Sequence, residues 1–365
     1  MWPLLHRRTA ARVRLYKKSS FVISPACLQV ALETLARGAE GETLTEIDTV
    51  LGGKEGRTAA QSSLFKKPLY YVSDNYRFHI GTSVWADKQR APLRDEYINS
   101  LKLLNSSTFA ANFGSAKTKE QMDRWLSENT GGKFSNAPNC NPQTTLTIIS
   151  ALDFKDTWID RLDNHEENKI FHGRESSSQV TMMTGFGSNA GMLTDVNNKG
   201  IAVSWQMDSG AYVVFTMPTA IDGIDEFIES GAAWKTISSC ITNKNNEYPE
   251  DGIELTVPEF ELTTETLKLK EIMYSMGVRR VFTPKAQLKG ITKADIMLDS
   301  VTQSSKFKLD PNGVEGSAFT LLVAVAGIPP EFPPPPIRLV FDRPFAFALF
   351  SQSKAPLFVG TYIGN

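Results

Sequence analysis

The chain has 365 residues and a formal net charge of −1, with 41% hydrophobic and 22% charged residues. This balance is that of an ordinary globular chain and does not indicate binding to nucleic acid or to an anionic membrane surface. No apolar run has the length of a membrane-spanning helix, and three cysteines without close spacing (Cys27, Cys140 and Cys240) do not predict a disulfide framework.

The N-terminal region is basic and lacks the apolar segment of a secretory signal peptide. Six basic residues precede the first acidic residue, Glu33: Arg7, Arg8, Arg12, Arg14, Lys17 and Lys18. An Arg-rich, acid-free start is found in transit peptides, but a shortened start or a basic first helix explains it as well. As written, residues 1–14 are an irregular basic start and a cytoplasmic location is expected, with an extracellular one as the alternative if the N-terminus is truncated.

Helical spacing is most frequent in the first third of the chain. Ser24-Pro25 is a good helix start and predicts a helix over 28–35, which ends at Gly38 to Gly41. The pattern also predicts helices over 43–51, 94–104 and 119–127, and one strand over 78–86.

Strand patterns are most frequent in the remaining two thirds. Strands are predicted over 144–154, 180–183, 192–194, 201–207, 212–217, 253–260, 301–309, 337–341, 345–350 and 357–361. Two helices lie among them, over 224–237 and 267–276. Because no linker and no internal repeat interrupts this order, we expect one α+β domain covering residues 1–365.

The most unusual stretch is Gly313 to Pro344. Its first part, Val314 to Val325, is small, apolar and able to form a strand, whereas Ile328 to Pro336 contains six prolines and cannot continue a sheet. As a strand, one face would carry Val314, Gly316, Ala318, Thr320, Leu322 and Ala324. Inserted into a sheet, this segment would gain on the order of ten ladder hydrogen bonds, each contributing roughly 1 kcal/mol. The alternative is an edge strand followed by a Pro-rich surface loop.

Motifs of catalysis are absent from the sequence. None of the four histidines lies in His-Glu-x-x-His, and neither a Gly-x-Ser-x-Gly elbow nor a phosphate-binding loop occurs. Gly185-Phe-Gly187-Ser-Asn-Ala190 fits a dinucleotide fingerprint only loosely, since no helix is predicted to follow it. His165 with Glu166 and Glu167 is better explained as a solvated turn than as a metal site. We therefore expect no enzyme activity, no catalytic residue, no metal and no cofactor.

Several separated motifs together resemble the serpin family, the serine protease inhibitor superfamily. The motifs are Phe21-Val-Ile-Ser-Pro25, Gly38-Ala-Glu-Gly41-Glu-Thr43, Phe154-Lys155-Asp-Thr-Trp158, Val180-Thr-Met182-Met183, Val257-Pro258-Glu-Phe260, Met276-Gly277-Val278, Asp342-Arg-Pro344-Phe345 and Phe358-Val-Gly360. Their order and spacing agree with the family from about residue 15 to residue 362. The resemblance implies an α+β fold with three β-sheets and about eight or nine helices.

The resemblance makes residues 313–344 the hinge and reactive-centre loop. Inhibitory members of the family act as suicide substrates: a serine or cysteine protease cleaves the loop, and the hinge half then inserts as a central strand and distorts the bound enzyme. Loop insertion of this kind is an established example of strand addition. The implied hinge comprises Pro311, Gly313, Val314, Glu315, Gly316, Ser317, Ala318, Phe319 and Thr320.

The hinge departs from the inhibitory pattern at several positions. Pro311 stands where the family usually has glutamate, and a proline there is expected to remove a ladder donor. Val314 replaces a Thr or Ser, Gly316 weakens a strand, and Phe319 is bulky, although it falls on the outward face. The alternative to inhibition is therefore a non-inhibitory serpin, which would be a carrier, a chaperone or a simple protease substrate.

The polar shutter beneath the opening sheet is also altered in this chain. By resemblance, the family's Ser, Asn and His positions are occupied by Cys27, Ser150 and Gln303, while Ser24 lies beside them. Trp158 of the breach region is kept.

The loop sequence predicts the class of target protease. Counting from Gly313 puts the scissile bond after Gly327, before Ile328, whereas alignment with family loops puts it after Ala326. No Lys or Arg lies between Gly313 and Arg338. A small apolar residue suits an elastase-like or subtilisin-like pocket and not a trypsin-like one. We expect a monomer with a target serine protease as partner, and neither nucleic acid nor membrane.

Overall fold

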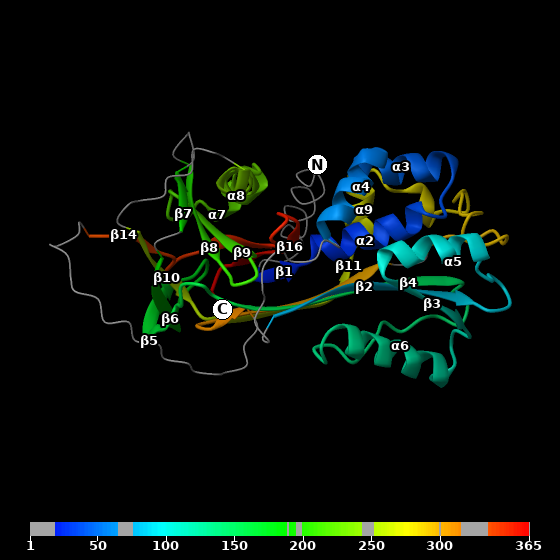
Figure 1. Ribbon diagram of the computed structural model, residues 1–365, viewed down its shortest axis with the longest axis horizontal. Coiled ribbons are helices and arrows are strands. Elements are labelled where there is room, and N and C mark those ends of the chain that lie inside the picture. Colours follow the sequence, from blue (N-terminus) through cyan, green and yellow to red (C-terminus); the bar gives the residue numbers. More distant parts are fainter. Residues whose placement is uncertain are drawn as a thin grey trace.

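The chain forms three β-sheets covered by helices, as the sequence led us to expect. The computed structural model describes residues 19–64, 76–187, 190–194, 199–242, 252–298, 301–314 and 335–364. Within these ranges there are eight α-helices and two 3₁₀-helices, and the strands form one four-stranded and two six-stranded sheets (Figure 1).

The central sheet contains the longest strand, β4, and the first described part of the predicted hinge, β13. In spatial order its strands are β11 (Phe260–Lys268), β12 (Thr302–Asp310), β13 (Gly313–Val314), β4 (Leu146–Thr157), β2 (Arg77–Asp87) and β3 (Ser106–Ala111). All neighbours are antiparallel except β2 and β3, which are parallel. Two strands far apart in sequence, β12 and β4, thus lie on either side of β13.

Helices cover both faces of the central sheet (Figure 1). On one face lie α2 (Pro25–Ala36), α3 (Gly41–Leu51), α4 (Gly53–Leu64), α5 (Asp95–Leu101) and α9 (Lys270–Met276), with the 3₁₀-helices η1 (Lys102–Leu104) and η2 (Arg280–Phe282) nearby. On the other face lies α6 (Ala116–Asn129), whose Met122, Trp125 and Leu126 pack on Ile149 and Ala151 of β4. Helices therefore cover both faces of the sheet at β2 and β4, whereas alternate residues of β12 are only half-buried.

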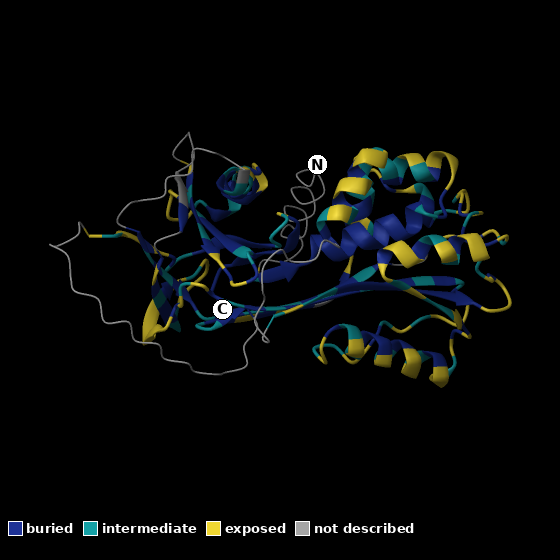
Figure 2. Ribbon diagram, viewed as in Figure 1, coloured by how far each residue is buried: buried dark blue, intermediate teal, exposed yellow. Residues whose placement is uncertain are grey.

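Helix α2 is the centre of the helical layer, and every one of its residues is buried (Figure 2). Ser24 begins the helix because its Oγ accepts a hydrogen bond from the N–H of Cys27, and Pro25 occupies the first turn, where a missing N–H costs nothing.

The other two sheets form the second half of the molecule. The second six-stranded sheet comprises β1 (Phe21–Ile23), β16 (Pro356–Tyr362), β15 (Phe345–Phe350), β9 (Tyr212–Pro218), β8 (Gly200–Gln206) and β7 (Gly191–Thr194), and it contacts α7 (Ile224–Glu229) and α8 (Ala232–Thr242). The four-stranded sheet comprises β14 (Ile337–Val340), β10 (Ile253–Pro258), β6 (Ser177–Gly187) and β5 (Asn164–His172). Both β15 and β16 are buried along their whole length.

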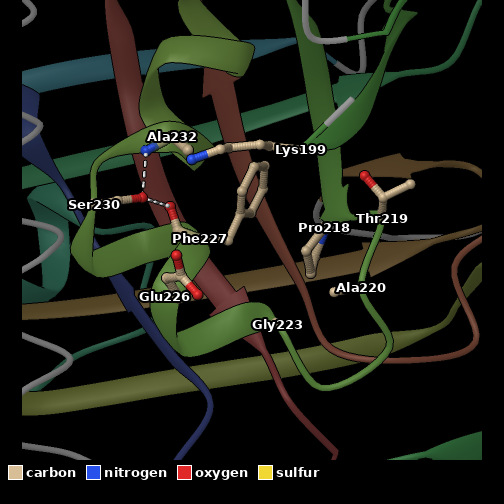
Figure 3. Close-up of a pocket in the computed structure, with 9 residues that line it drawn as sticks. All are labelled: Lys199, Pro218, Thr219, Ala220, Gly223, Glu226, Phe227, Ser230 and Ala232. Carbon is tan, nitrogen blue, oxygen red and sulfur yellow. Dashed lines mark hydrogen bonds between the residues drawn. The ribbon is translucent and has the colours of Figure 1, made fainter. Parts of the chain in front are cut away.

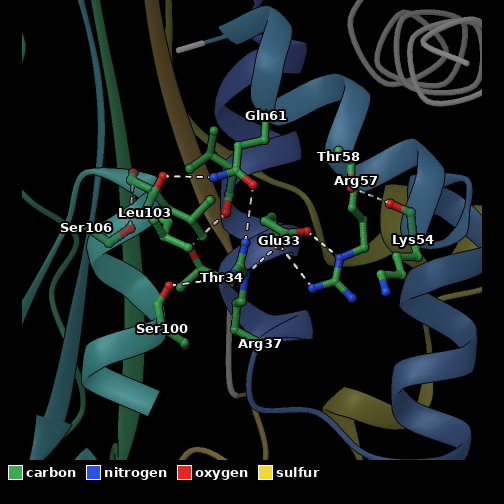
Figure 4. A network of polar contacts seen from close by, with 12 residues as sticks. Glu33, Thr34, Arg37, Lys54, Arg57, Thr58, Gln61, Ser100, Leu103 and Ser106 are labelled. Carbon is green, nitrogen blue, oxygen red and sulfur yellow. Dashed lines mark hydrogen bonds and ion pairs between the residues drawn. The ribbon is translucent and has the colours of Figure 1, made fainter. Parts of the chain in front are cut away.

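An ion-pair network holds the helices of the first face together (Figure 4). Glu33 of α2 is 5% exposed and accepts from Arg37 at 2.7 Å and from Arg57 of α4 at 2.5 Å. Arg57 also pairs with Asp48 of α3 at 3.1 Å, and Arg37 reaches Gln61 of α4 at 3.3 Å. Because the carboxylate is buried, its partners are needed to offset its loss of hydration.

Most predicted elements are confirmed, but several were missed or misplaced. The pattern did not reveal β1, α4, β3, β5 or β11. Residues Glu166 and Glu167 lie in β5 rather than in a turn. The predicted helix over 224–237 is two helices, because Gly231 between them has φ +75°. The helix predicted from Leu267 begins only at Lys270, since Leu267 and Lys268 still belong to β11.

No helix in the described ranges has both the length and the apolar character needed to cross a membrane.

Candidate functional site

The hinge begins as a strand of the central sheet. In β13, Val314 is opposite Leu309 of β12 and Asp156 of β4, and Gly313 is opposite Asp310 and Thr157. Val314 is 2% exposed and belongs to the same apolar cluster as Leu309. Two residues of the predicted hinge, Gly313 and Val314, therefore occupy a place between two strands of the sheet.

Pro311 lies in the turn between β12 and β13 and not within a strand. Asn312 N–H donates to Asp310 Oδ1 at 2.9 Å, and the carbonyl of Asn312 accepts from Trp158 N–H at 3.0 Å. The indole Nε1–H of Trp158 donates to the carbonyl of Asp310 at 3.0 Å. The expectation that Pro311 removes a ladder donor is wrong, because a two-residue turn has no ladder position for it. Through these two hydrogen bonds, Trp158 holds the turn between β12 and β13.

Gly313 makes the closest approach in the site. A β-carbon at this position would lie 2.0 Å from the carbonyl oxygen of Asp156 and 2.9 Å from the α-carbon of Thr157. Both are backbone atoms that cannot rotate away. Only glycine fits here while β13 is paired with β4.

Asp156 is a buried carboxyl beside the hinge. It is 1% exposed and accepts hydrogen bonds from the Oγ of Ser209 at 2.5 Å and from the N–H of Thr157 at 2.9 Å. Burial raises its pKa from 3.8 to about 6, although these hydrogen bonds act in the opposite direction. Sequence reasoning missed Asp156, and the available signal was its place in Phe154-Lys155-Asp156-Thr157-Trp158, where the resembled motif has glycine.

The shutter residue Gln303 bonds to the start of α2 and not to β4. Its Oε1 accepts from Ser24 N–H at 2.9 Å, and its Nε2 donates to the carbonyl of Ser24 at 2.7 Å. Ser305 Oγ donates to the same Oε1 at 3.4 Å. The side-chain amide of Gln303 thus makes the same pair of hydrogen bonds to Ser24 that a backbone peptide group would make. These bonds connect β12 to the N-terminal cap of α2.

The other two shutter positions lie close by but have different partners. Ser150 of β4 is 3.4 Å from the hydroxyl of Thr82 on β2. Cys27 is 3% exposed, and burial raises the pKa of its thiol to about 12. The structure thus brings together Ser24, Cys27 and Gln303, whereas Ser150 is bonded within the other half of the sheet.

The remaining predicted site residues lie outside the described residues. They are the hinge residues Glu315, Gly316, Ser317, Ala318, Phe319 and Thr320 and the reactive-bond residues Ala326, Gly327 and Ile328.

A surface hollow of about 290 Å³ lies away from the hinge, between the end of β9 and the helices α7 and α8 (Figure 3). Its walls include Lys199, Phe227 and Glu226, and the Lys199 side chain extends over the Phe227 ring toward Ala232 (Figure 3). Lys199 and Glu226 are exposed, so the hollow is open to solvent.

Metal chemistry has no support within the described ranges, where no group of three or more His, Cys, Asp and Glu side chains is placed to hold an ion.

Three β-sheets with helices on both faces of the central one, and a two-residue strand β13 between β12 and β4, are the features of this α+β fold. The chain belongs to the serpin family, because the family model described as "Serpin (serine protease inhibitor)" matches residues 7–364. It is thus a member of a family of protease inhibitors and not of an enzyme family.

Curated relatives agree with this assignment over most of their length. A "Serine protease inhibitor" of Cyanea capillata is 24% identical over 94% of this chain and 92% of its own. "Alpha-1-antitrypsin 1-3" of Mus musculus is 26% identical over 94% of this chain and 83% of its own.

Solved structures share the fold at low sequence identity. A thyroxine-binding globulin in complex with thyroxine has a TM-score of 0.83 at 19% identity, covering 100% of this chain and 98% of its own. Serpin48 of the insect Tenebrio molitor has a TM-score of 0.83 at 20% identity, covering 100% and 97%. Uncleaved ovalbumin has a TM-score of 0.82 at 17% identity, covering 100% and 99%. These likenesses concern the fold alone.

Proposed function

We propose that this protein inhibits serine endopeptidases, with cysteine endopeptidases as a second class, by acting as a suicide substrate. The observation that carries the proposal is β13: the hinge residues Gly313 and Val314 are already hydrogen-bonded between β12 and β4. A strand that starts in this position can lengthen after cleavage without breaking an existing register.

The register of β13 determines which residues would meet if the strand lengthened. From Val314 opposite Asp156 and Leu309, two residues further along brings Gly316 between Phe154 and Phe307. Both phenylalanines face the core. A glycine has the small size that the space between two large rings requires. Gly316 therefore suits this position in the sheet, although glycine by itself weakens a strand.

The same count supports insertion further along the strand. Phe319 would lie between the small residues Ala151 and Ser304, on the face that α6 covers. Thr320 would lie between Ser150 and Gln303, where a hydroxyl meets other polar side chains. Leu322 would lie between Ile148 and Val301, both buried. At each of these positions the loop residue thus matches its neighbours on β4 and β12 in size or in polarity.

The target is proposed from the loop sequence. The Val-Ala-Gly-Ile segment around Ala326 and Gly327 offers a small apolar residue to an elastase-like or subtilisin-like pocket.

A non-inhibitory serpin is the alternative, and one observation favours it. The hollow places a charged side chain, Lys199, beside the aromatic ring of Phe227 on a concave surface, a combination that small-molecule sites use. A carrier would use such a hollow and would need no strand insertion.

The test is incubation of the purified protein with an elastase and with a subtilisin, followed by denaturing gels and thermal melting of the cleaved protein. We expect a high-mass band that survives denaturant and a large rise in melting temperature after cleavage. Cleavage near Ala326 with a raised melting temperature but no band would mean that insertion is too slow to trap the enzyme. Cleavage with no change in melting temperature would exclude inhibition by insertion.

A further inference from the structure

The short strand β13 and the buried carboxyl of Asp156 are directly coupled by the sheet. Residues opposite each other in an antiparallel pair place their side chains on one face, with β-carbons roughly 5 Å apart. Val314 and Asp156 are such a pair, and both are almost fully buried, at 2% and 1% exposure. The apolar side chain of Val314 therefore shields the carboxyl from water on the side of β12.

We propose that Asp156 makes the docking of the hinge sensitive to acid. The protonated carboxyl favours the docked state, in which Val314 lies beside it, and the ionised carboxyl favours the state in which β13 is released. A strand of two residues has few ladder bonds, so a single charge can shift its equilibrium.

The direction of this effect follows from the pKa of Asp156. In the docked state burial raises this pKa to about 6 from the ordinary value of 3.8. The docked state therefore binds the proton more tightly, so docking is strongest at low pH and weakens as the pH rises through this interval. If the whole pKa shift of Asp156 depended on hinge docking, the docking equilibrium constant would change by at most about 25-fold between pH 4.5 and pH 7.

The neighbouring charges do not neutralise Asp156. Asp208, exposed and hydrogen-bonded to Thr157 Oγ1 at 2.5 Å, raises the pKa of Asp156 further. Burial, with a smaller contribution from the charge of Asp156, raises the pKa of Tyr76 to about 12. The ion pair of Lys308 with Asp310 lies on the other face of β12, since both alternate with the core-facing Leu309. Among the described side chains, the hydrogen bonds to the Asp156 carboxyl come from neutral donors.

This inference concerns hinge docking itself, and only its consequence for protease trapping rests on the proposed function. An acid-sensitive hinge would start strand addition faster in a mildly acidic compartment than at neutral pH.

The test is ¹⁹F NMR of protein labelled with 5-fluorotryptophan, without any protease. The indole of Trp158 bonds to the β12–β13 turn, so its resonance reports docking, and the variant Trp158→Phe assigns it among the six tryptophans. We expect the docked signal to fall by several-fold between pH 4.5 and pH 7.5 while the other resonances keep their positions. A docked fraction that is constant over this range would overturn the inference.

Two variants test whether the carboxyl of Asp156, and not another titrating group, causes the pH dependence of docking. Asp156→Asn keeps the shape without the charge, and we expect it to stay docked at every pH. Asp208→Asn is the matched control on an exposed carboxyl: it should keep the pH dependence, with the midpoint moved to lower pH because Asp208 raises the pKa of Asp156. If Asp156→Asn follows the wild-type curve, the inference is wrong.

Ser209→Ala provides an independent check should Asp156→Asn fail to fold. The hydrogen bond from Ser209 lowers the pKa of Asp156, so its removal should move the midpoint of docking to higher pH. An unmoved midpoint would contradict the role of Asp156. The docking measurement contains no protease and so does not depend on inhibition. If docking depends on pH but the protein fails to trap a protease in the separate assay, only the proposed function is refuted.

Discussion

Gly313 and Asp156 lie so close together that a β-carbon on Gly313 would be 2.0 Å from the Asp156 carbonyl oxygen. The contact joins the hinge to β4 at the point where the hinge enters the sheet. A residue larger than glycine at this position must push the two strands apart.

Gly313→Ala should therefore prevent the docking of β13 while leaving the rest of the fold intact. In the elastase and subtilisin assay we expect loss of the denaturant-stable band and faster turnover of the loop as a plain substrate. The measurement is the ratio of complex to cleaved chain on denaturing gels.

Pro311→Ala is the matched control for this variant. Pro311 lies in the turn before Gly313 and not in the ladder, so its replacement should leave the ratio unchanged within about twofold. Equal complex formation by Gly313→Ala and the wild type would mean that strand entry does not pass through the position seen here.

Replacing Gln303 should destabilise the molecule through the cap of α2. Gln303→Leu would leave the N–H and carbonyl of Ser24 buried without their partner, and we expect a loss of about 2–4 kcal/mol in the free energy of unfolding. Urea unfolding at pH 7 measures it. Ser150→Ala loses only a 3.4 Å contact to Thr82, and it should cost less than about 1 kcal/mol. A larger loss for Ser150→Ala than for Gln303→Leu would contradict this assignment.

Removing the carboxylate of Glu33 should weaken the helical layer. Glu33→Ala leaves two arginines without their buried partner, so we expect a loss of about 3–5 kcal/mol. Asp48→Ala, at the more exposed end of the same network, should cost less than about 1 kcal/mol. Comparable losses for the two variants in urea unfolding would show that burial does not set the strength of this network.

Asp87 should contribute stability that disappears in acid. The side-chain hydrogen bond from Arg90, at 2.8 Å, holds the pKa of Asp87 at about 2, below the ordinary 3.8. Its contribution is therefore complete above pH 4 and is lost as the pH falls toward 2. At pH 6, Asp87→Asn should be about 1–2 kcal/mol less stable than the wild type, and this difference should shrink by pH 3. A difference that does not depend on pH would contradict the assigned pKa.

Much of the fold could be predicted from local patterns and from the spacing of motifs. Long strands such as β4 and β12 have clear apolar alternation, and α2 has a Ser-Pro start. The missed elements have physical reasons: β5 is mostly exposed and polar, and α4 begins at Gly53, in a Gly-Gly pair that normally ends a helix.

The site was less accessible to sequence reasoning because its contacts are long-range. Hydrogen bonds from Gln303 to Ser24 and from Ser209 to Asp156 join residues far apart in the chain, and no local pattern predicts them. The error over Pro311 arose because a strand was assumed to run without a turn between Asp310 and Gly313.

The chain that follows the loop is held as firmly as the chain before it. β14 pairs with β10 from Ile337 onward, and β15 and β16 are buried along their whole length between other strands. A cut between Val314 and Ile337 would consequently separate two pieces that remain interlocked. The nicked protein should elute from gel filtration as one particle of unchanged mass, and only denaturant should release its short C-terminal piece.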